Sequence, residues 1–171
     1  EEYLGVDIQY GGIAQRKILM FARENLGKLG YRKRAEVMTP LIPGLVGKKM
    51  SASDPKSKID LLDTPEEVIK KVQGAHCPEG VAEDNGILAF LKHVIMVLKE
   101  DKKESLIIER PEKFGGKLTF KTYSDIEEAF VSKRLHPLDL KNAVAGEINK
   151  LLEPFQKQKE KLEKVARLGY P

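Results

Sequence analysis

The chain contains the stretch Pro43-Gly44-Leu45-Val46-Gly47-Lys48-Lys49-Met50-Ser51-Ala52-Ser53, in which glycines stand beside lysines and short hydroxyl side chains. Glycine lets the backbone bend, lysine supplies positive charge for phosphoryl oxygens, and Ser51 and Ser53 supply short hydrogen-bond donors. The stretch therefore predicts a glycine-hinged loop that binds a polyphosphate. The same residue types also make up ordinary solvated turns, so the flanking sequence is needed to distinguish a phosphate-binding loop from a turn.

The residues before this loop predict the end of a doubly wound α/β domain. Apolar side chains recur at three- and four-residue steps from Ile13 to Leu29, which indicates an amphipathic helix that ends at Gly30. A short extended run, 35–38, precedes Thr39-Pro40 and predicts a strand that leads into the loop. Ligands of such domains bind at the carboxyl ends of the strands, where the loop is expected.

The residues after the loop predict a mainly helical domain. Helices are expected over residues 64–73, from a cap at Asp84 or Asn85, over 124–135, and from 138 onward with a kink at Pro154. Two short strands, 106–109 and 118–123, predict a small hairpin between them. The predicted fold is thus an α/β remnant, the C-terminal part of a catalytic domain over residues 1–63, followed by a helical domain over residues 64–171.

Composition excludes several classes of protein. Thirty basic and 26 acidic residues leave a net charge of only +4, so charge alone is weak support for nucleic-acid binding. The single Cys77 rules out an internal disulfide framework and fits a reducing compartment. One cysteine and three scattered histidines give no metal-ligand spacing, and no apolar run is long enough to cross a membrane. A cytoplasmic protein that is bound to no membrane is expected.

Several blocks of the sequence resemble one family. Lys49-Met50-Ser51-Ala52-Ser53 is similar to the KMSKS signature of class I aminoacyl-tRNA synthetases. Upstream, residues 6–17 (VDIQYGGIAQRK) resemble the VDxQxGGxDQRK block of the tyrosyl-tRNA synthetases. Downstream, residues 57–63, 85–88 and 136–142 are similar to the same family in the same order. The resemblance implies a Rossmann-type catalytic domain and an anticodon-binding domain of the eukaryotic and archaeal tyrosyl type.

The resemblance also implies roles for residues near the nucleotide. Lys49, Ser51 and Ser53 are expected to act in catalysis by stabilising the pyrophosphate leaving group of ATP, with Met50 and Gly12 also at the ATP site. ATP is expected as its Mg²⁺ complex. Gln15 is expected to contact L-tyrosine. The family's usual aspartate before that glutamine is Ala14 here, and the signature's second lysine is Ala52, which leaves a catalytically degraded copy as an open alternative.

The helical part is expected to recognise tRNA(Tyr). Specific RNA readout uses splayed bases stacked on aromatic rings and hydrogen-bonded at their edges. By resemblance, Phe114 would stack the first anticodon base and Asp139 would accept hydrogen bonds from that guanine, with His136 beside them. Phe114 could instead be tucked into the core, and Asp139 could simply cap a helix. Further candidates for phosphate contacts are Lys113, Lys117, Lys121 and Lys141.

Three further expectations follow. The chain lacks the family's HIGH motif and starts without methionine, so it is expected to be a fragment that is inactive alone, from an enzyme that forms a homodimer. Asp60 and Asp63 could form an acid–base pair, but a position at the domain junction fits them better. Two other functions remain open: a module that only binds tRNA, and a tryptophanyl-tRNA synthetase.

Overall fold

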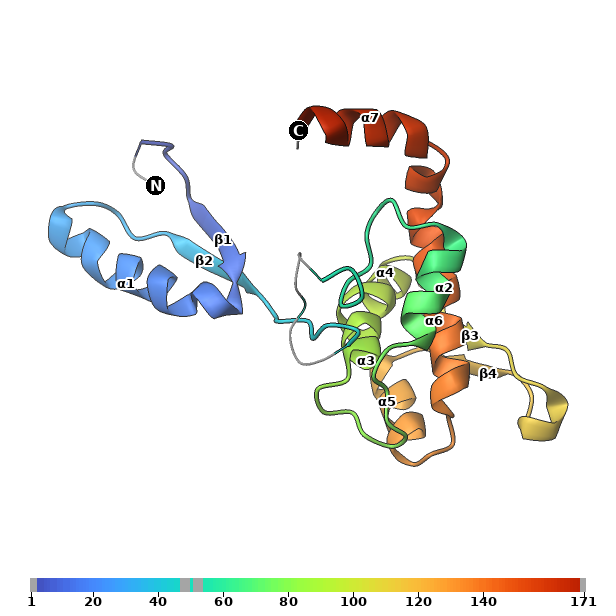
Figure 1. The fold of residues 1–171 in the computed structure, drawn as a ribbon. Helices are drawn as coiled ribbons and strands as arrows, with labels where there is room; N and C mark the ends of the chain where they lie inside the picture. The colour runs from blue at the N-terminus through green and yellow to red at the C-terminus, as the bar shows by residue number, and fades with distance from the viewer. Residues whose placement is uncertain (1–2, 47–49, 51–53, 170–171) are drawn as a thin grey trace. The chain divides into compact units, whose positions relative to one another are not determined.

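The computed structural model describes residues 3–46, 50 and 54–169, and the chain divides into two compact units, residues 1–41 and 42–171. Figure 1 shows the helices and strands of each unit. The name Gly/Lys/Ser loop is used below for residues 47–53, and the name stem for residues 43–46, which belong to the second unit. The predicted functional boundary at residues 63 and 64 does not coincide with this division and stays a prediction.

The first unit is a small β-α-β arrangement. Strand β1 (Ile8–Gly12) leads through a 3-10 turn (Ile13–Gln15) into α1 (Arg16–Leu26), and a second 3-10 turn ends at Leu29. Strand β2 (Ala35–Thr39) pairs in parallel with β1, with Ile8 opposite Ala35 and Gly12 opposite Thr39. The predicted helix and strand are confirmed, and Gly30 ends the helix with a left-handed φ of 81°. Strand β1 was not predicted, because its residues Gln9, Gly11 and Gly12 do not favour a strand.

Burial in this unit is limited to one side of the helix. Leu19 is the one buried apolar side chain that the structure describes here, whereas Ile18 and Phe21 are 70% and 69% exposed. Gly11 lies against the start of the helix, and a Cβ atom there would approach the Gln15 amide oxygen to 2.8 Å. One helix on a two-stranded sheet can cover only a narrow apolar stripe, so most of the predicted apolar face stays open.

The second unit is mainly helical. Its helices are α2 (Pro65–Gln73), α3 (Gly86–Phe90), α4 (Met96–Asp101), α5 (Tyr123–Val131), α6 (Pro137–Gln156) and α7 (Lys159–Gly169). A π-helical turn, Leu91–Ile95, joins α3 to α4. Strands β3 (Leu106–Ile108) and β4 (Leu118–Phe120) form an antiparallel pair, with Leu106 opposite Phe120. The expected mainly helical part with a small β-hairpin is thus observed.

Helix α6 is the centre of the core. Leu140, Val144, Ile148 and Leu152 repeat every four residues along one face and are at most 6% exposed. Helix α2 lies along α6 (Figure 1) and adds the fully buried Val68 and Val72. Burying each such aliphatic side chain stabilises the fold by about 1.5–3 kcal/mol. Polar bonds align the two helices as well, since Lys141 donates to the Gln73 carbonyl at 3.0 Å and Asn149 to that of Pro65 at 3.3 Å.

One helix cap resolves an alternative that the sequence analysis left open, and another corrects a predicted helix boundary. Thr64 caps α2 as expected, with its hydroxyl accepting from the Glu67 amide at 3.3 Å. Asn85, not Asp84, caps α3 by accepting from the amides of Ile87 and Leu88. Thr122 caps α5, so this helix begins at Tyr123 and ends at Val131 rather than spanning 124–135. In both cases neighbouring residues offered equivalent caps, and only the tertiary position of the helix decides between them.

Candidate functional site

The three residues predicted to recognise an anticodon line one pocket. This α6 pocket has a volume of about 360 Å³ and is lined by Arg110, Phe114, Lys133, Arg134, His136, Leu138 and Asp139. Phe114 comes from the turn between β3 and β4, whereas His136 and Asp139 come from the start of α6, more than 20 residues away in sequence. The lining includes three cationic side chains and one carboxylate, and one of the cations, Arg134, is also paired with Glu128 at 2.9 Å. The pocket therefore suits an anionic ligand that also presents donors to Asp139.

Phe114 is presented to solvent rather than to the core. It ends the 3-10 turn Glu112–Phe114, and its side chain is 60% exposed. The turn then reverses through Gly115 and Gly116, whose φ angles of 90° and 64° lie in the left-handed region that glycine adopts without strain. The Nζ atom of Lys113 lies 4.9 Å from the Phe114 ring centroid. A flat apolar ring is therefore held at the mouth of a cationic pocket, an arrangement suited to stacking a base.

Arg110 holds this turn in place. Its Nε atom donates to the Gly116 carbonyl at 3.0 Å, and its Nη1 atom donates to the Arg134 carbonyl at 3.0 Å. The same guanidinium thus joins the turn that carries Phe114 to the segment that leads into α6. Sequence analysis missed Arg110, Lys133 and Arg134 as pocket residues. A signal was present for Arg110, which directly precedes the turn of Pro111 to Gly116, but its partners are backbone atoms that no pattern identifies.

His136 and Asp139 lie in the first turn of α6. The Nδ1 atom of His136 accepts a hydrogen bond from the Leu138 amide at 3.1 Å, so the imidazole caps the helix. In this arrangement a ring proton lies on Nε2, which can donate to a ligand. Asp139 is half-buried in the first turn of α6. The pocket therefore combines an aromatic face, a donor and a carboxylate acceptor.

The Gly/Lys/Ser loop is described only at its stem and at Met50. Its predicted residues Lys49, Ser51 and Ser53, together with Lys48 and Ala52, lie outside the described residues. At the stem, the Leu45 amide donates to the Ser57 carbonyl at 3.0 Å, and the Leu45 carbonyl accepts from the His76 amide at 2.7 Å. The two sides of the loop are thus joined to each other and to the segment after α2.

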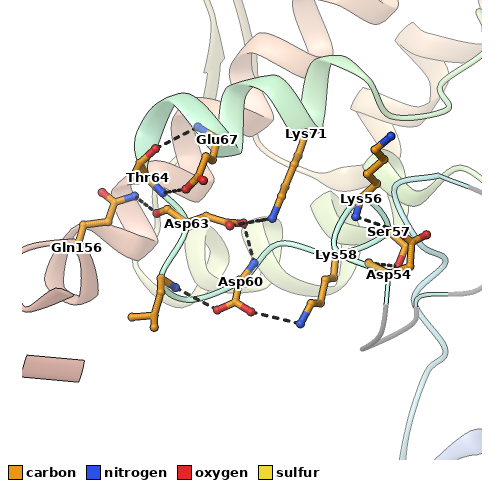
Figure 2. Close-up of polar contacts among 11 residues, drawn as sticks. Asp54, Lys56, Ser57, Lys58, Asp60, Asp63, Thr64, Glu67, Lys71 and Gln156 are labelled. Carbon is orange, nitrogen blue, oxygen red and sulfur yellow. Dashed lines mark hydrogen bonds and ion pairs between the residues drawn. The ribbon is translucent and has the colours of Figure 1, made fainter. Parts of the chain in front are cut away.

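The chain that follows the loop is fixed by a polar network (Figure 2). Both carboxylate oxygens of Asp63 accept from the Lys71 Nζ atom, at 2.7 and 2.6 Å, and one also accepts from the Asp60 amide at 2.8 Å. Hydrogen bonding from the Leu62 amide lowers the pKa of Asp60 and outweighs the effect of burial, with Lys58 adding to the shift. The lowered pKa of Asp60 means that its charged form is stabilised, and the Asp63 carboxylate is held by Lys71 and the Asp60 amide, which argues against the acid–base pair considered from sequence.

Gly12 and Gln15 are in direct contact in the first unit. The Gln15 amide oxygen accepts from the Gly12 amide at 3.2 Å, so the side chain turns back over the start of its own helix. Gln15 and Ala14 are both exposed. The predicted contact of Gln15 with L-tyrosine and of Gly12 with ATP therefore stays a prediction.

The candidate phosphate contacts have different environments. Lys113 lies over the Phe114 ring, and Lys117 forms a long ion pair with Glu109 at 4.0 Å. Lys141 is used inside the fold, where it holds α6 to α2. Within residues 3–46, 50 and 54–169, no group of three or more histidine, cysteine or acidic side chains could hold a metal ion. In the same part of the chain, no helix is both long and apolar enough to cross a bilayer.

Comparison with known proteins identifies the family of the chain. Residues 1–153 match the model of the family described as tRNA synthetases class I (W and Y). The chain is 47% identical to a cytoplasmic tyrosine–tRNA ligase of Saccharomyces cerevisiae, over all of this chain and 45% of that protein. The crystal structure of a tyrosyl-tRNA synthetase from Archaeoglobus fulgidus, complexed with L-tyrosine, superposes with a TM-score of 0.81 at 43% identity, over 92% of this chain and 48% of that one.

A tryptophanyl-tRNA synthetase from Giardia lamblia shares the fold only, with a TM-score of 0.62 at 21% identity over 90% of this chain and 35% of that one. The tyrosyl members are similar in sequence as well as in fold. The chain spans between about a third and a half of the length of the curated relatives named first among its matches. The chain belongs to the class I tRNA synthetases (W and Y) and, within them, to the tyrosyl-tRNA synthetase family.

Proposed function

We propose that this chain is part of a cytoplasmic tyrosine–tRNA ligase, which activates L-tyrosine with ATP and transfers it to tRNA(Tyr). In this proposal, residues 1–63 contribute to the catalytic domain and residues 64–171 form the anticodon-binding domain. The chain alone lacks a HIGH motif and is proposed to be inactive. The whole enzyme is proposed to act as a homodimer and to use ATP as its Mg²⁺ complex.

The observation that carries the proposal is the convergence of Phe114, His136 and Asp139 on the α6 pocket. Phe114 offers a stacking surface for the first anticodon base. The Asp139 carboxylate accepts hydrogen bonds from the N1–H and exocyclic amino groups of a guanine, and His136 Nε2–H donates to an acceptor of the same nucleotide. Arg110, Lys133 and Arg134 supply positive charge for the phosphates on either side.

In this proposal, residues 1–63 take part in the activation of tyrosine. Lys49, Ser51 and Ser53 stabilise the charge that develops on the pyrophosphate as the tyrosine carboxylate attacks the α-phosphate of ATP. Met50 and Gly12 contribute to the ATP site, and Gln15 orients the tyrosine. Interactions that strengthen in the transition state raise the rate of this step without holding ATP more tightly in the ground state.

The test uses the full-length enzyme and two assays. Phe114→Ala and Asp139→Ala should each reduce charging of tRNA(Tyr) by about 10- to 100-fold, as expected for loss of one stacked or hydrogen-bonded base. Tyrosine activation, measured by ATP–pyrophosphate exchange, should be unchanged in both variants. Lys49→Ala should instead abolish most of the exchange. Equal loss of both activities in the Phe114 and Asp139 variants would contradict the assignment.

A second candidate function rests on Ala14 and Ala52, which replace an expected aspartate and a second lysine. Both changes remove polar groups from the proposed nucleotide site, as in a degraded copy that only binds tRNA. Such a protein would bind tRNA(Tyr) through the α6 pocket but show no ATP–pyrophosphate exchange. Exchange that depends on Lys49 would reject this candidate.

A further inference from the structure

Gly86 makes an unusually close contact with the stem of the Gly/Lys/Ser loop. It is the first residue of α3 and is buried. A Cβ atom built on Gly86 would lie 2.5 Å from the Gly44 carbonyl oxygen and 3.2 Å from that of Pro43. Both neighbours are backbone atoms, so no side-chain rotation can make room. Any residue other than glycine would force the loop stem and α3 apart.

The position of Gly86 is itself fixed from the helix side. The Asn85 side chain accepts from the amides of Ile87 and Leu88 at 3.1 and 3.2 Å and donates to the Val81 carbonyl at 3.1 Å. Ile87 and Leu88 are at most 1% exposed in the core. The stem is therefore the more adaptable side of the contact, and a larger residue would displace Pro43 and Gly44.

Displacement at this point would be passed to the loop. Leu45, the next residue, is 6% exposed and bonds through its amide to Ser57 and through its carbonyl to His76. A small apolar pocket of about 180 Å³ adjoins the same place and is lined by residues of the stem, of α3 and α6, and by Met50 of the loop itself. The loop thus emerges from a stem whose position is determined by the helical unit.

We propose that Gly86 is a positioning residue for the Gly/Lys/Ser loop. Because Gly86 has no side chain, α3 can pack directly against the carbonyls of Pro43 and Gly44, and this contact determines where the loop leaves the helical unit. This inference rests on the proposed role of Lys49, Ser51 and Ser53 with ATP. It makes the core of the proposed anticodon-binding domain a determinant of the activation step. A displacement of about 1 Å can reduce the rate of a chemical step by roughly 100-fold.

The test compares Gly86→Ala with the matched control Gly146→Ala. Gly146 lies inside α6, and a Cβ atom there would meet nothing within 4 Å. Both glycines are helical, and the contact of Gly86 with the stem is the main steric difference between the two variants. Each is made in the full-length enzyme and measured by ATP–pyrophosphate exchange, tRNA(Tyr) affinity, thermal unfolding and hydrogen exchange at the Leu45 and His76 amides.

Gly86→Ala should lower kcat of the exchange by about 10- to 100-fold. Because the loop stem opens more easily, the Leu45 and His76 amides should exchange at least about tenfold faster. Affinity for tRNA(Tyr) should stay within about twofold. Gly146→Ala should match the wild type in ATP–pyrophosphate exchange, tRNA affinity and hydrogen exchange, with an unfolding temperature equal to or above that of the wild type. Equal losses of ATP–pyrophosphate exchange and of tRNA affinity would indicate general unfolding and overturn the proposal. An unchanged kcat of ATP–pyrophosphate exchange would overturn it as well.

Two further measurements keep the outcomes separate. If Lys49→Ala retains full activity, the proposed role of the loop fails, whereas hydrogen exchange still reports whether Gly86 fixes the stem. Should Gly86→Ala not fold, Leu45→Ala loosens the same stem by removing a side chain that is 6% exposed and lies on the apolar pocket beside Gly86. A lower kcat of ATP–pyrophosphate exchange with tRNA(Tyr) affinity retained would support control of the loop through its stem, and an unchanged kcat would overturn it.

Discussion

Arg110 closes the turn that presents Phe114, because its Nε atom donates to the Gly116 carbonyl at 3.0 Å. The same side chain also bonds the Arg134 carbonyl, so one guanidinium links both walls of the α6 pocket. The aromatic ring itself has few core contacts, being 60% exposed. Its position therefore depends on Arg110 more than on packing.

Arg110→Ala is expected to weaken tRNA(Tyr) binding although Phe114 remains. Loss of the two hydrogen bonds should destabilise the fold by only about 1 kcal/mol, since water can replace them at this partly exposed site. Titration of labelled tRNA measures the affinity, and urea unfolding measures the stability. Arg134→Ala is the control for the turn, because it keeps the backbone carbonyl that accepts from Arg110. Equal effects of the two substitutions would show that charge, not the linkage, matters.

Two substitutions of His136 should distinguish its role as a helix cap from a contact with RNA. His136→Ala removes the acceptor for the Leu138 amide and should destabilise the protein by about 1 kcal/mol, as for other N-caps. His136→Asn supplies an amide oxygen that can cap α6, so its thermal stability should remain near that of wild type. If Nε2 contacts the nucleotide, both variants should bind tRNA(Tyr) less tightly. If the His136→Asn variant is stable and binds tRNA(Tyr) with wild-type affinity, His136 acts only as a helix cap and does not contact the RNA.

The Asp63–Lys71 pair should stabilise the chain between the loop and α2. The two side chains are only 10% and 19% exposed, and Asp63 also accepts from the Asp60 amide. Asp63→Ala leaves a shielded ammonium and amide without their partner, which should lower the free energy of unfolding by about 2 kcal/mol. A double-mutant cycle with Lys71→Met, followed by urea unfolding, measures the coupling. Strictly additive effects would contradict a direct interaction.

Acid should destabilise the helical unit partly through Glu147. Burial raises its pKa, but hydrogen bonds from Lys150 and Lys99 outweigh that effect, so the pKa lies below the usual value of about 4.5. The folded protein therefore binds this proton less readily than the unfolded chain. The carboxylate stabilises the fold fully above about pH 4.5, and this contribution is lost as the pH falls through the lower folded-state pKa.

Glu147→Gln should accordingly lower the unfolding temperature at pH 7, with the difference from wild type shrinking below about pH 4. Thermal unfolding between pH 3 and pH 7 measures this trend. Glu83→Gln, an exposed glutamate in a loop of the same unit, is the matched control and should show no such convergence. A difference between Glu147→Gln and wild type that stays constant with pH would contradict the assignment.

Much of the secondary structure follows from local sequence signals. Thr64-Pro65 with two acidic residues after it marks the start of α2, and His136-Pro137 marks the start of α6. Strand β1 could not be predicted, since its pairing with β2 depends on a partner more than 20 residues away and its own residues do not favour a strand. The π-helical turn at Leu91–Ile95 also has no signal in the residue pattern.

The residues of the candidate site also fall into two groups, those that could be predicted from the sequence and those that could not. Phe114, His136 and Asp139 could be predicted because the segments that carry them resemble the tyrosyl-tRNA synthetases, and the structure brings all three to one pocket. Arg110 and Gly86 could not, because their roles depend on backbone carbonyls of Gly116, Arg134 and Gly44 that only the folded chain brings near. Contacts to backbone atoms leave no trace in the composition of the segments that make them.

The most direct test of the central claim is the affinity of the protein for tRNA(Tyr) transcripts that differ only in the first anticodon base. The wild type should bind the guanine form about 10- to 100-fold more tightly than the adenine form, because adenine offers Asp139 no N1–H and no 2-amino group. Asp139→Ala should remove this preference while Asp125→Ala, in the first turn of α5, preserves it. Undiminished discrimination by Asp139→Ala would contradict the claim that the α6 pocket recognises the anticodon.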